Sequence, residues 1–533
     1  MLTTACKTFP CPQSSDEKDL QTLYKRAKTP PIRRFLHAAA TILSIVRRQG
    51  KTSRLDKAAP FRLKYTGKIS EVTMDYKEYQ ENLEKKHHAE ISRLAKLNGK
   101  GIAINPKLYQ KYDVKRGLRD INGNGVVCGL TEISEIISFK KDDKGEKAPC
   151  KGELYYRGYN VSDLVDGFIQ RKRYGFEETA YLLLFGKLPS AEDLKHFSDM
   201  LCDYRLLPTN FVRDIIMKSP SRDMMNMLAR CVLNLYSYDR QAEKVSVSNV
   251  LRQSLQLIAR FPLLTVYSNN AYKYYNTECS LYIHKPDPSL STAENLLYIL
   301  RDDNKFTELE AMVLDICLIL HAEHGGGNNS TFTTHVVSSS GTDTYSSVAA
   351  SLGSLKGPKH GGANVKVVQM FDNIKENVHG FTDGNLRDYL IKMLDKEVFD
   401  KSGLIYGMGH AVYSLSDPRC DILKDCAMKL AAEKNMTEEF ELHTRVAKIA
   451  GELIAERRKI YKGVSPNVDF YSGLIYDMLK LDRELYTPLF AVSRIAGWSA
   501  HRLEEIASGG KIIRPSYISI SGQKKYVPID ERN

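Results

Sequence analysis

Histidine, arginine and aspartate gather in glycine-bearing segments of this 533-residue chain. The segments are HAEHGGGNNST (321–331), KGPKHGGAN (356–364), YGMGHAVYSLSDPR (406–419) and SPNVDFYSG (465–473). Imidazole and carboxylate groups transfer protons, while guanidinium groups bind carboxylates in a two-pronged geometry. Glycine allows a positive φ and a close approach of a ligand to the main chain. We therefore expect the chemistry of this protein to lie in these loops.

Two glycine-flanked histidines, His360 and His410, and one aspartate, Asp469, are the candidates for proton transfer. Asp469 lies between apolar neighbours, and burial would raise its pKa toward that of a useful base. Taken one at a time, the histidines could equally be polar loop residues. Together with the arginines they favour catalysis.

Three arginines, Arg419, Arg494 and Arg514, could each grip a carboxylate in fork geometry. Any one of them alone could instead form a surface ion pair. With the proton-transfer groups beside them, they predict a site for a dicarboxylic acid.

A metal site is an alternative for His321 and His324, which lie three residues apart. The HExxH spacing is absent, and the His-x-Glu of zinc deaminases lacks its downstream Pro-Cys-x-x-Cys partner. Histidines that close a helix before a glycine loop are the simpler interpretation, so no metal is predicted. The chain also lacks a Rossmann GxGxxG after a strand and a P-loop.

The elements that must position these loops are mostly helices. A charged helix is expected near 75–98, and residues 117–160 alternate turn signals with short β-branched runs that predict a few strands. After about residue 162, apolar residues recur at spacings of three and four in one segment after another. Helix after helix without intervening strands predicts a mostly α fold.

Composition describes an ordinary globular chain, with 42% hydrophobic and 26% charged residues. Its ten cysteines form no CxxC pair, which suggests reduced thiols in a cytoplasmic compartment. No apolar run approaches the roughly 20 residues that span a bilayer, so no membrane association is expected.

The net charge of +13 is concentrated at the N-terminus, where residues 1–73 carry +10 and the remaining chain only +3. A basic tail on a nearly neutral body does not predict a nucleic-acid-binding face. We expect residues 1–73 to be a basic extension, either disordered or a translated leader ahead of a natural start at Met74. A targeting peptide is the alternative, but the acidic stretch SSDEKDL argues against it.

The four loops, in this order, resemble those of the citrate synthase family. The motifs AVSRIAGWSAH and KIIRP follow them, and the resemblance covers about residues 115–520, with an N-terminal part like that of bacterial-type members. It implies a mostly α homodimer with two helical domains. The large domain would comprise residues 74–362 and 481–533, and a small domain, 363–480, would close over the site.

The resemblance also implies a reaction: acetyl-CoA condenses with oxaloacetate and water to give citrate and CoA, the entry step of the tricarboxylic acid cycle. Asp469 would take a proton from the acetyl methyl group while His360 stabilises the enol or enolate, and His410 would activate the oxaloacetate carbonyl. The implied oxaloacetate ligands are His324, Arg419, Arg494 and Arg514, the last supplied across the dimer interface. No metal or other cofactor is implied, since the CoA thioester is a substrate.

The chain departs from the family pattern at two positions. Ser414 stands where many members carry Arg or Lys directed at CoA phosphates, and Ala411 where bacterial members often carry Arg. Lys356, Lys359 and Lys366 are conceivable substitutes, although solvated surface lysines are the simpler interpretation.

Three rival functions remain. The nearest is 2-methylcitrate synthase, which shares the motifs and uses propionyl-CoA. A non-catalytic relative would have lost His360, His410 or Asp469, and all three are present. A nucleic-acid binder would have to rely on the N-terminal charge alone.

Overall fold

A computed structural model describes residues 76–99, 104–120, 125–141, 147–409, 412–413, 415–458 and 464–532. The predicted extension, 1–73, lies outside the described residues, as do His410, Ala411 and Ser414. The chain divides into two units, residues 1–117 and 118–533, which are described separately. Among the described helices, none is long and apolar enough to cross a membrane.

The first unit contains the charged helix that the sequence predicts. Helix α4 spans Tyr76–Gly99, and a short helix, α5, spans Pro106–Lys111. The Asn105 side chain caps α5 by accepting a hydrogen bond from the backbone of Lys107 at 3.0 Å, which satisfies one of the free N–H groups of the first turn.

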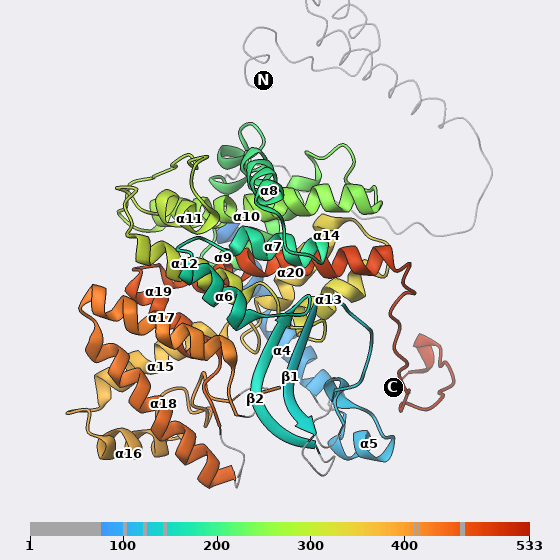
Figure 1. The fold of residues 1–533 in the computed structure, drawn as a ribbon. Helices are drawn as coiled ribbons and strands as arrows, with labels where there is room; N and C mark the ends of the chain where they lie inside the picture. The colour runs from blue at the N-terminus through green and yellow to red at the C-terminus, as the bar shows by residue number, and fades with distance from the viewer. Residues whose placement is uncertain are drawn as a thin grey trace, which may run out of the picture. The chain divides into compact units, whose positions relative to one another are not determined.

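The second unit begins with the predicted strands, which form one small antiparallel sheet. Strands β1 (Ser134–Lys141), β2 (Lys147–Tyr156) and β3 (Tyr159–Asn160) pair in that order, and the register of β1 against β2 shifts between Ile137 and Phe139. Figure 1 shows β1 and β2 as two long curved strands beside the helices.

Helices make up most of the rest of the second unit, as predicted. The first group runs α6 (Val161–Gln170), α7 (Phe176–Phe185), α8 (Ala191–Tyr204), a π-helical turn (Val212–Ile216), α9 (Met224–Tyr236), α10 (Val247–Asn276), α11 (Thr292–Leu300), α12 (Glu308–His321), α13 (Asn329–Ser338) and α14 (Thr344–Leu355). The second group runs α15 (Ala363–Asn377), α16 (Asp383–Leu394), α17 (Pro418–Lys434), α18 (Thr437–Arg458), α19 (Val468–Met478), a 3₁₀ turn (Arg483–Leu485) and α20 (Tyr486–Ala507). A last 3₁₀ turn, Ile529–Glu531, lies near the C-terminus.

Polar residues start several of these helices in the way that the sequence suggests. Ser190, Ser291 and Thr307 each form a capping box, in which the cap side chain and the acidic third residue bond each other's backbone. Helix α7 begins differently, because its cap residue, Gly175, has no side chain. The carboxyl of Asp315 in α12 instead accepts the backbone N–H groups of Gly175 (2.7 Å) and Phe176 (3.3 Å).

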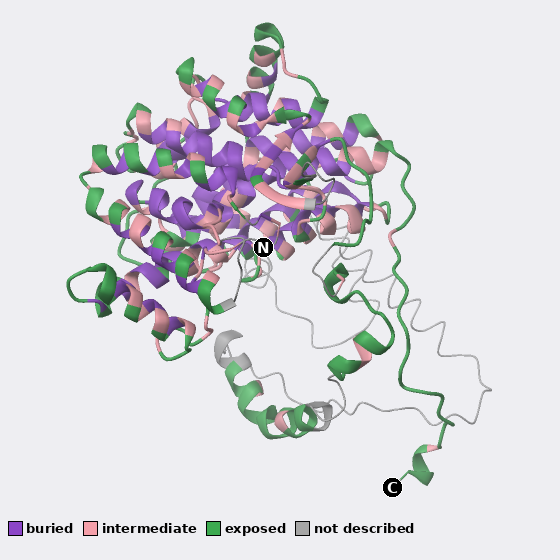
Figure 2. Ribbon diagram, turned by 60° about the horizontal axis from the view of Figure 1, so that its bottom comes forward, coloured by how far each residue is buried: buried purple, intermediate pink, exposed green. Residues whose placement is uncertain are grey.

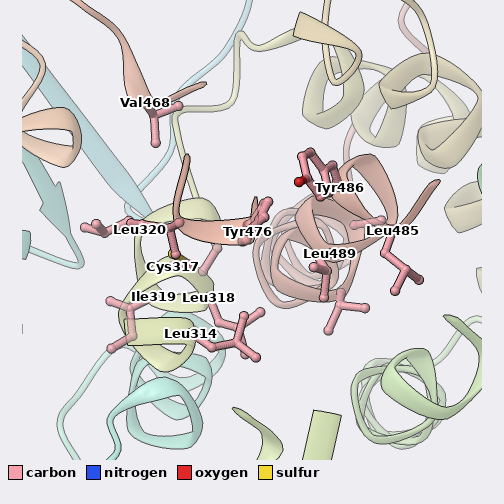
Figure 3. Close-up of a cluster of buried hydrophobic side chains, with 14 of the residues drawn as sticks. Leu314, Cys317, Leu318, Ile319, Leu320, Val468, Tyr476, Leu485, Tyr486 and Leu489 are labelled. Carbon is pink, nitrogen blue, oxygen red and sulfur yellow. The ribbon is translucent and has the colours of Figure 1, made fainter. Parts of the chain in front are cut away.

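The core is built around α12 and α20. Figure 3 shows Leu314 and Leu318 of α12 facing Leu485 and Leu489, near the start of α20, with Tyr476 of α19 alongside. All five side chains are buried. Helix α20 also packs against α7, α10, α13 and α14, and Figure 2 shows buried residues filling the centre of this helical body. Burying apolar side chains of this size contributes about 1.5–3 kcal/mol each, so this packing fixes the elements that carry the site.

The predicted division into a large domain, 74–362 plus 481–533, and a small domain, 363–480, stays a prediction. Residues 118–533 form one unit in this structure, in which α12 packs against α17 and α15 packs against α20.

Candidate active site

Five of the predicted site residues lie on elements that converge. His324 follows the end of α12, and His360 lies in the loop between α14 and α15. Arg419 and Asp469 occupy the first turns of α17 and α19, and Arg494 lies in the middle of α20.

Phe490 marks the point where three of these elements meet. Its ring centroid lies 6.2 Å from that of His360, 4.8 Å from that of His321, and 4.7 Å from the guanidinium carbon of Arg494. Arg494 also donates from Nε to the carbonyl of His321 at 2.7 Å. The loop after α14, the end of α12 and α20 therefore form one wall.

His360 is held as a neutral imidazole with a defined tautomer. Burial, with Arg494 adding to it, lowers its pKa to about 4. The backbone N–H of Ser330 donates to Nε2 of His360 (3.4 Å), and the Ser330 hydroxyl lies 2.9 Å from the same nitrogen. Because Nε2 accepts, the ring proton is on Nδ1 and points away from Ser330.

The glycine after His360 serves packing within the chain. A Cβ at Gly361 would lie 2.5 Å from the carbonyl oxygen of Leu355 and 2.9 Å from the Thr487 side chain. Neither Gly361 nor Gly362 has a positive φ. We expected this glycine pair to let a ligand approach the main chain. The close contacts at Gly361 are instead made by the Leu355 carbonyl and the Thr487 side chain.

Asp469 combines a raised pKa with access to solvent. Its backbone N–H donates to the Asn467 side chain at the start of α19 (3.0 Å), and its own side chain is only partly exposed. The surrounding protein raises the pKa of Asp469 to about 7 by desolvation, although Arg419 and Arg494 act to lower it. Near neutral pH this carboxyl can both take up and release a proton.

The two buried arginines differ in how they are held. Arg419 forms a two-pronged ion pair with Asp417 (Nε to Oδ1 3.0 Å, Nη2 to Oδ2 2.8 Å), which raises the pKa of Arg419 despite its burial. Burial lowers the pKa of Arg494 to about 10, and its Nη2 has no hydrogen-bond partner among the described residues. A buried donor without a partner is costly, so Arg494 is suited to bind an anion from outside the chain.

His324 is buried, and its ring packs edge-on against Tyr413, with the centroids 5.6 Å apart. His321 closes α12, as the simpler interpretation of the motif expects. Its Nδ1 bonds the carbonyl of Cys317 at 2.7 Å, and burial lowers its pKa to about 3. Within the described part of the chain no cluster of three or more metal-binding side chains occurs.

Arg514 lies apart from these residues. It is exposed and follows Ile513, whose N–H donates to Ser339 just after the end of α13. Ser330, which contacts His360, lies at the start of the same helix, so about 12 Å of helix separates the two points. Within one chain, the backbone next to Arg514 is thus held at the opposite end of α13 from the Ser330–His360 contact.

The lysines considered for CoA lie at the surface. Lys356 pairs with Asp223, Lys359 is exposed, and Lys366 lies 3.5 Å from Asp400.

Two contributing residues, Ser330 and Trp498, were not predicted. The indole Nε1 of Trp498, a fully buried residue of α20, donates to the Ser330 hydroxyl at 3.2 Å, and Ser330 in turn holds His360. The residues 328–330 and 498 fall inside the quoted motifs, but nothing in their spacing reveals a contact across 168 positions.

Comparisons with known proteins identify the family. Residues 121–516 match the family described as "Citrate synthase, C-terminal domain". A citrate synthase from Synechocystis sp. is 36% identical over 72% of this chain and 88% of its own length. One from Haloferax volcanii is 33% identical over 79% and 99%. A 2-methylcitrate synthase from Shewanella oneidensis is 31% identical over 71% and 92%.

Solved structures show the same fold. Citrate synthase from Pyrobaculum aerophilum superimposes with a TM-score of 0.62 at 28% identity, covering 77% of this chain and 95% of that one. The citrate synthase of Thermoplasma acidophilum, solved as a ternary complex with carboxymethyl coenzyme A and oxaloacetate, gives 0.63 at 27% identity, covering 79% and 99%. From its matched length, its similarity to these relatives and its fold, this chain belongs to the citrate synthase family.

Proposed function

We propose that this protein condenses acetyl-CoA with oxaloacetate and water to give citrate and CoA, the entry step of the tricarboxylic acid cycle. It is an acyltransferase that converts the acyl group to an alkyl group on transfer. The observation that carries the proposal is the pairing of a carboxyl with a pKa near neutrality, Asp469, and a neutral histidine, His360, with Arg494 acting on the pKa of both.

Removing a proton from the acetyl methyl group requires a base and a donor to the thioester carbonyl at the same time. The ionised Asp469 takes the proton, and Nδ1–H of His360 donates to the carbonyl oxygen as the enol or enolate forms. An imidazolium at His360 would be more acidic than a neutral imidazole and would lose the Nδ1 proton more readily. The lowered pKa of His360 keeps the ring neutral. Ser330 fixes the tautomer that has the proton on Nδ1.

Oxaloacetate lies next to the enol in this proposal. Arg494 and Arg419 bind its carboxylates, and the buried His324 adds a hydrogen bond. His410, which precedes α17 in the sequence, activates the oxaloacetate carbonyl as the C–C bond forms, and water then hydrolyses the citryl thioester.

Arg514 completes the site from the second subunit of a homodimer. The support is its exposed position away from the site of its own chain. Neither nucleic acid nor membrane is a partner in this proposal, and no metal or cofactor enters it. The eight described cysteines are free thiols, which supports work in the cytoplasm.

A second candidate is 2-methylcitrate synthase, which is represented among the relatives at 30–31% identity. One added methylene changes binding in an apolar pocket by only about 1–3 kcal/mol, so the two thioesters are close competitors. The test is to measure kcat/KM for acetyl-CoA and propionyl-CoA with saturating oxaloacetate, following citrate or methylcitrate formation. We expect acetyl-CoA to have the higher kcat/KM. A higher value for propionyl-CoA would reverse the assignment, and no product from either would refute the function.

A further inference from the structure

Four titratable side chains form a continuous hydrogen-bonded chain behind the oxaloacetate end of the site. Glu505 Oε2 lies 2.8 Å from Nδ1 of His335, whose Nε2 lies 3.0 Å from Nδ1 of His501. Nε2 of His501 lies 3.1 Å from Oε1 of Glu323. Glu505 and His335 keep a small exposed fraction, whereas the His501 and Glu323 side chains are fully buried. We call these four residues the relay.

The relay has three contacts, and each joins two atoms that need one proton between them. Two carboxylates and two neutral imidazoles supply only two such protons, one from each ring. A third proton completes the relay, wherever along it the proton resides. If that proton is lost, one contact becomes a repulsion between two acceptors.

The inner end of the relay is joined to the segment that carries His324. Helix α20 contacts residues 318–323 through a Ser493 hydrogen bond to the Leu318 carbonyl, the Arg494 bond to the His321 carbonyl, and the His501 bond to Glu323. A Cβ at Gly497 would lie 2.4 Å from both the Ala322 carbonyl oxygen and Oε2 of Glu323. The His501–Glu323 bond is therefore the last attachment of this segment to α20 before His324, while the Tyr156 hydroxyl donates to the Glu323 carbonyl from β2 at 3.0 Å.

The charges facing the relay come from every side. Glu504 of α20 approaches Nδ1 of His501 to 3.9 Å, and the Ser134 hydroxyl of β1 donates to Glu323 at 2.9 Å. Arg157, which follows β2, interacts electrostatically with Glu323, with Glu504 and with Glu132, which precedes β1. Arg494 of α20 lowers the pKa of Glu323. Burial alone would raise the pKa of Glu323, but His501, Arg494 and Ser134 outweigh it and lower the pKa to about 2. Glu323 thus stays a carboxylate, and at the inner end of the relay it is the acceptor of the bond to Nε2 of His501.

We propose that Glu323 and His501 are positioning residues for His324 and Arg494, and that the relay keeps them in place only while it holds its third proton. The inference rests on the proposed function, in which His324 and Arg494 bind oxaloacetate. The arrangement is complete at lower pH and is lost as the pH rises and the proton leaves. Oxaloacetate affinity falls in step.

The test uses the whole protein and His335→Gln. A glutamine amide donates to Nδ1 of His501 at every pH, so the inner contacts no longer need the third proton. The measurement is the dissociation constant of oxaloacetate, by calorimetry without acetyl-CoA, between about pH 6 and about pH 9. We expect the constant of the wild type to rise about tenfold more over this range than that of His335→Gln, the size expected for one charge-assisted hydrogen bond.

Two neighbouring glutamates provide a matched pair. Glu505→Gln places an amide donor at the outer end, so two ring protons suffice and the extra pH dependence should again disappear. Glu504→Gln removes the same charge one residue away but leaves the relay intact, and should keep the wild-type dependence. Circular dichroism melting of each variant checks that it is folded.

Superimposable pH profiles for the wild type, His335→Gln and Glu505→Gln would overturn the inference while leaving the proposed function in place. Loss of the dependence in Glu504→Gln would also overturn it, because net charge would then be the cause. A wild-type protein that binds no oxaloacetate at any pH would refute both proposals.

Discussion

At the scale of single residues, Asp469 and His360 have their pKa values moved in directions that suit opposite roles. Burial raises the pKa of the acid to about 7 and lowers that of the histidine to about 4. The same physical cause, removal from water, disfavours the charged form of each group. One site thus holds a carboxyl that can act as a base near neutral pH and an imidazole that stays a neutral donor.

Asp469→Asn should remove the base and leave the shape of the site unchanged. We expect kcat to fall by at least about a thousandfold, while the dissociation constant of oxaloacetate changes less than about twofold. In the wild type, kcat/KM for acetyl-CoA should fall as the pH drops through about 7, because the base becomes protonated. Steady-state kinetics from about pH 5.5 to 8.5 check both statements. A variant with unchanged kcat would refute the role of Asp469.

The sequence could predict site residues because each of them lies in a short motif. His324, His360, Arg419, Asp469 and Arg494 could be named from their segments, and the structure places them on converging elements. Ser330 and Trp498 could not be assigned a role, because their contacts join positions 30 and 168 residues apart. Spacing along the chain carries no information about such contacts until the helices are packed.

At the scale of the elements, α20 organises the site from one face. Arg494, Gly497, Trp498 and His501 occupy positions i, i+3, i+4 and i+7, so they share the side of the helix that meets α12 and α13. The periodicity predicted the helix itself. It could not tell which neighbours the buried stripe would meet, because an apolar stripe specifies burial and not a partner.

Gly497→Ala tests how closely α20 must approach α12. Alanine is the better helix former by about 1 kcal/mol, but its Cβ would lie 2.4 Å from the backbone oxygen of Ala322. The clash should prevail, lowering the free energy of unfolding by about 1–3 kcal/mol. Gly353→Ala is the control, since this exposed glycine of α14 has nothing within 4 Å of a new Cβ and should gain up to about 1 kcal/mol. Urea unfolding of both variants measures the difference, and equal shifts would contradict the close approach.

At the scale of the whole molecule, the proposed position of Arg514 makes each active site a joint product of two chains. The site of one subunit would use its own Asp469 and the other subunit's Arg514. A dimer interface is formed by surface residues from distant parts of the chain. The KIIRP motif alone could therefore suggest a shared active site only through its resemblance to the family. Figure 2 shows the exposed segment after α20 leading away from the helical body, and Arg514 belongs to this segment.

Mixing two inactive variants tests this sharing. Arg514→Ala and Asp469→Asn homodimers should each be inactive, but a heterodimer of the two has one site with neither defect. After random exchange of subunits, half of the dimers are mixed and one of their two sites is intact. We expect about a quarter of the wild-type activity per site. Verified heterodimers without activity would argue against a shared site.

The start of α7 is capped by a residue of another helix, Asp315 of α12, and this has a consequence for how the molecule opens. Asp315 of α12 bonds the first N–H groups of α7, and Glu177 of α7 accepts the N–H of Thr292 at the start of α11 at 2.7 Å. Each helix start is thus completed by a helix more than 100 residues away along the chain. Neither α7 nor α11 can fray at its beginning without breaking its contact to α12 or to α7. They should open and close together, as one cooperative unit behind the catalytic wall.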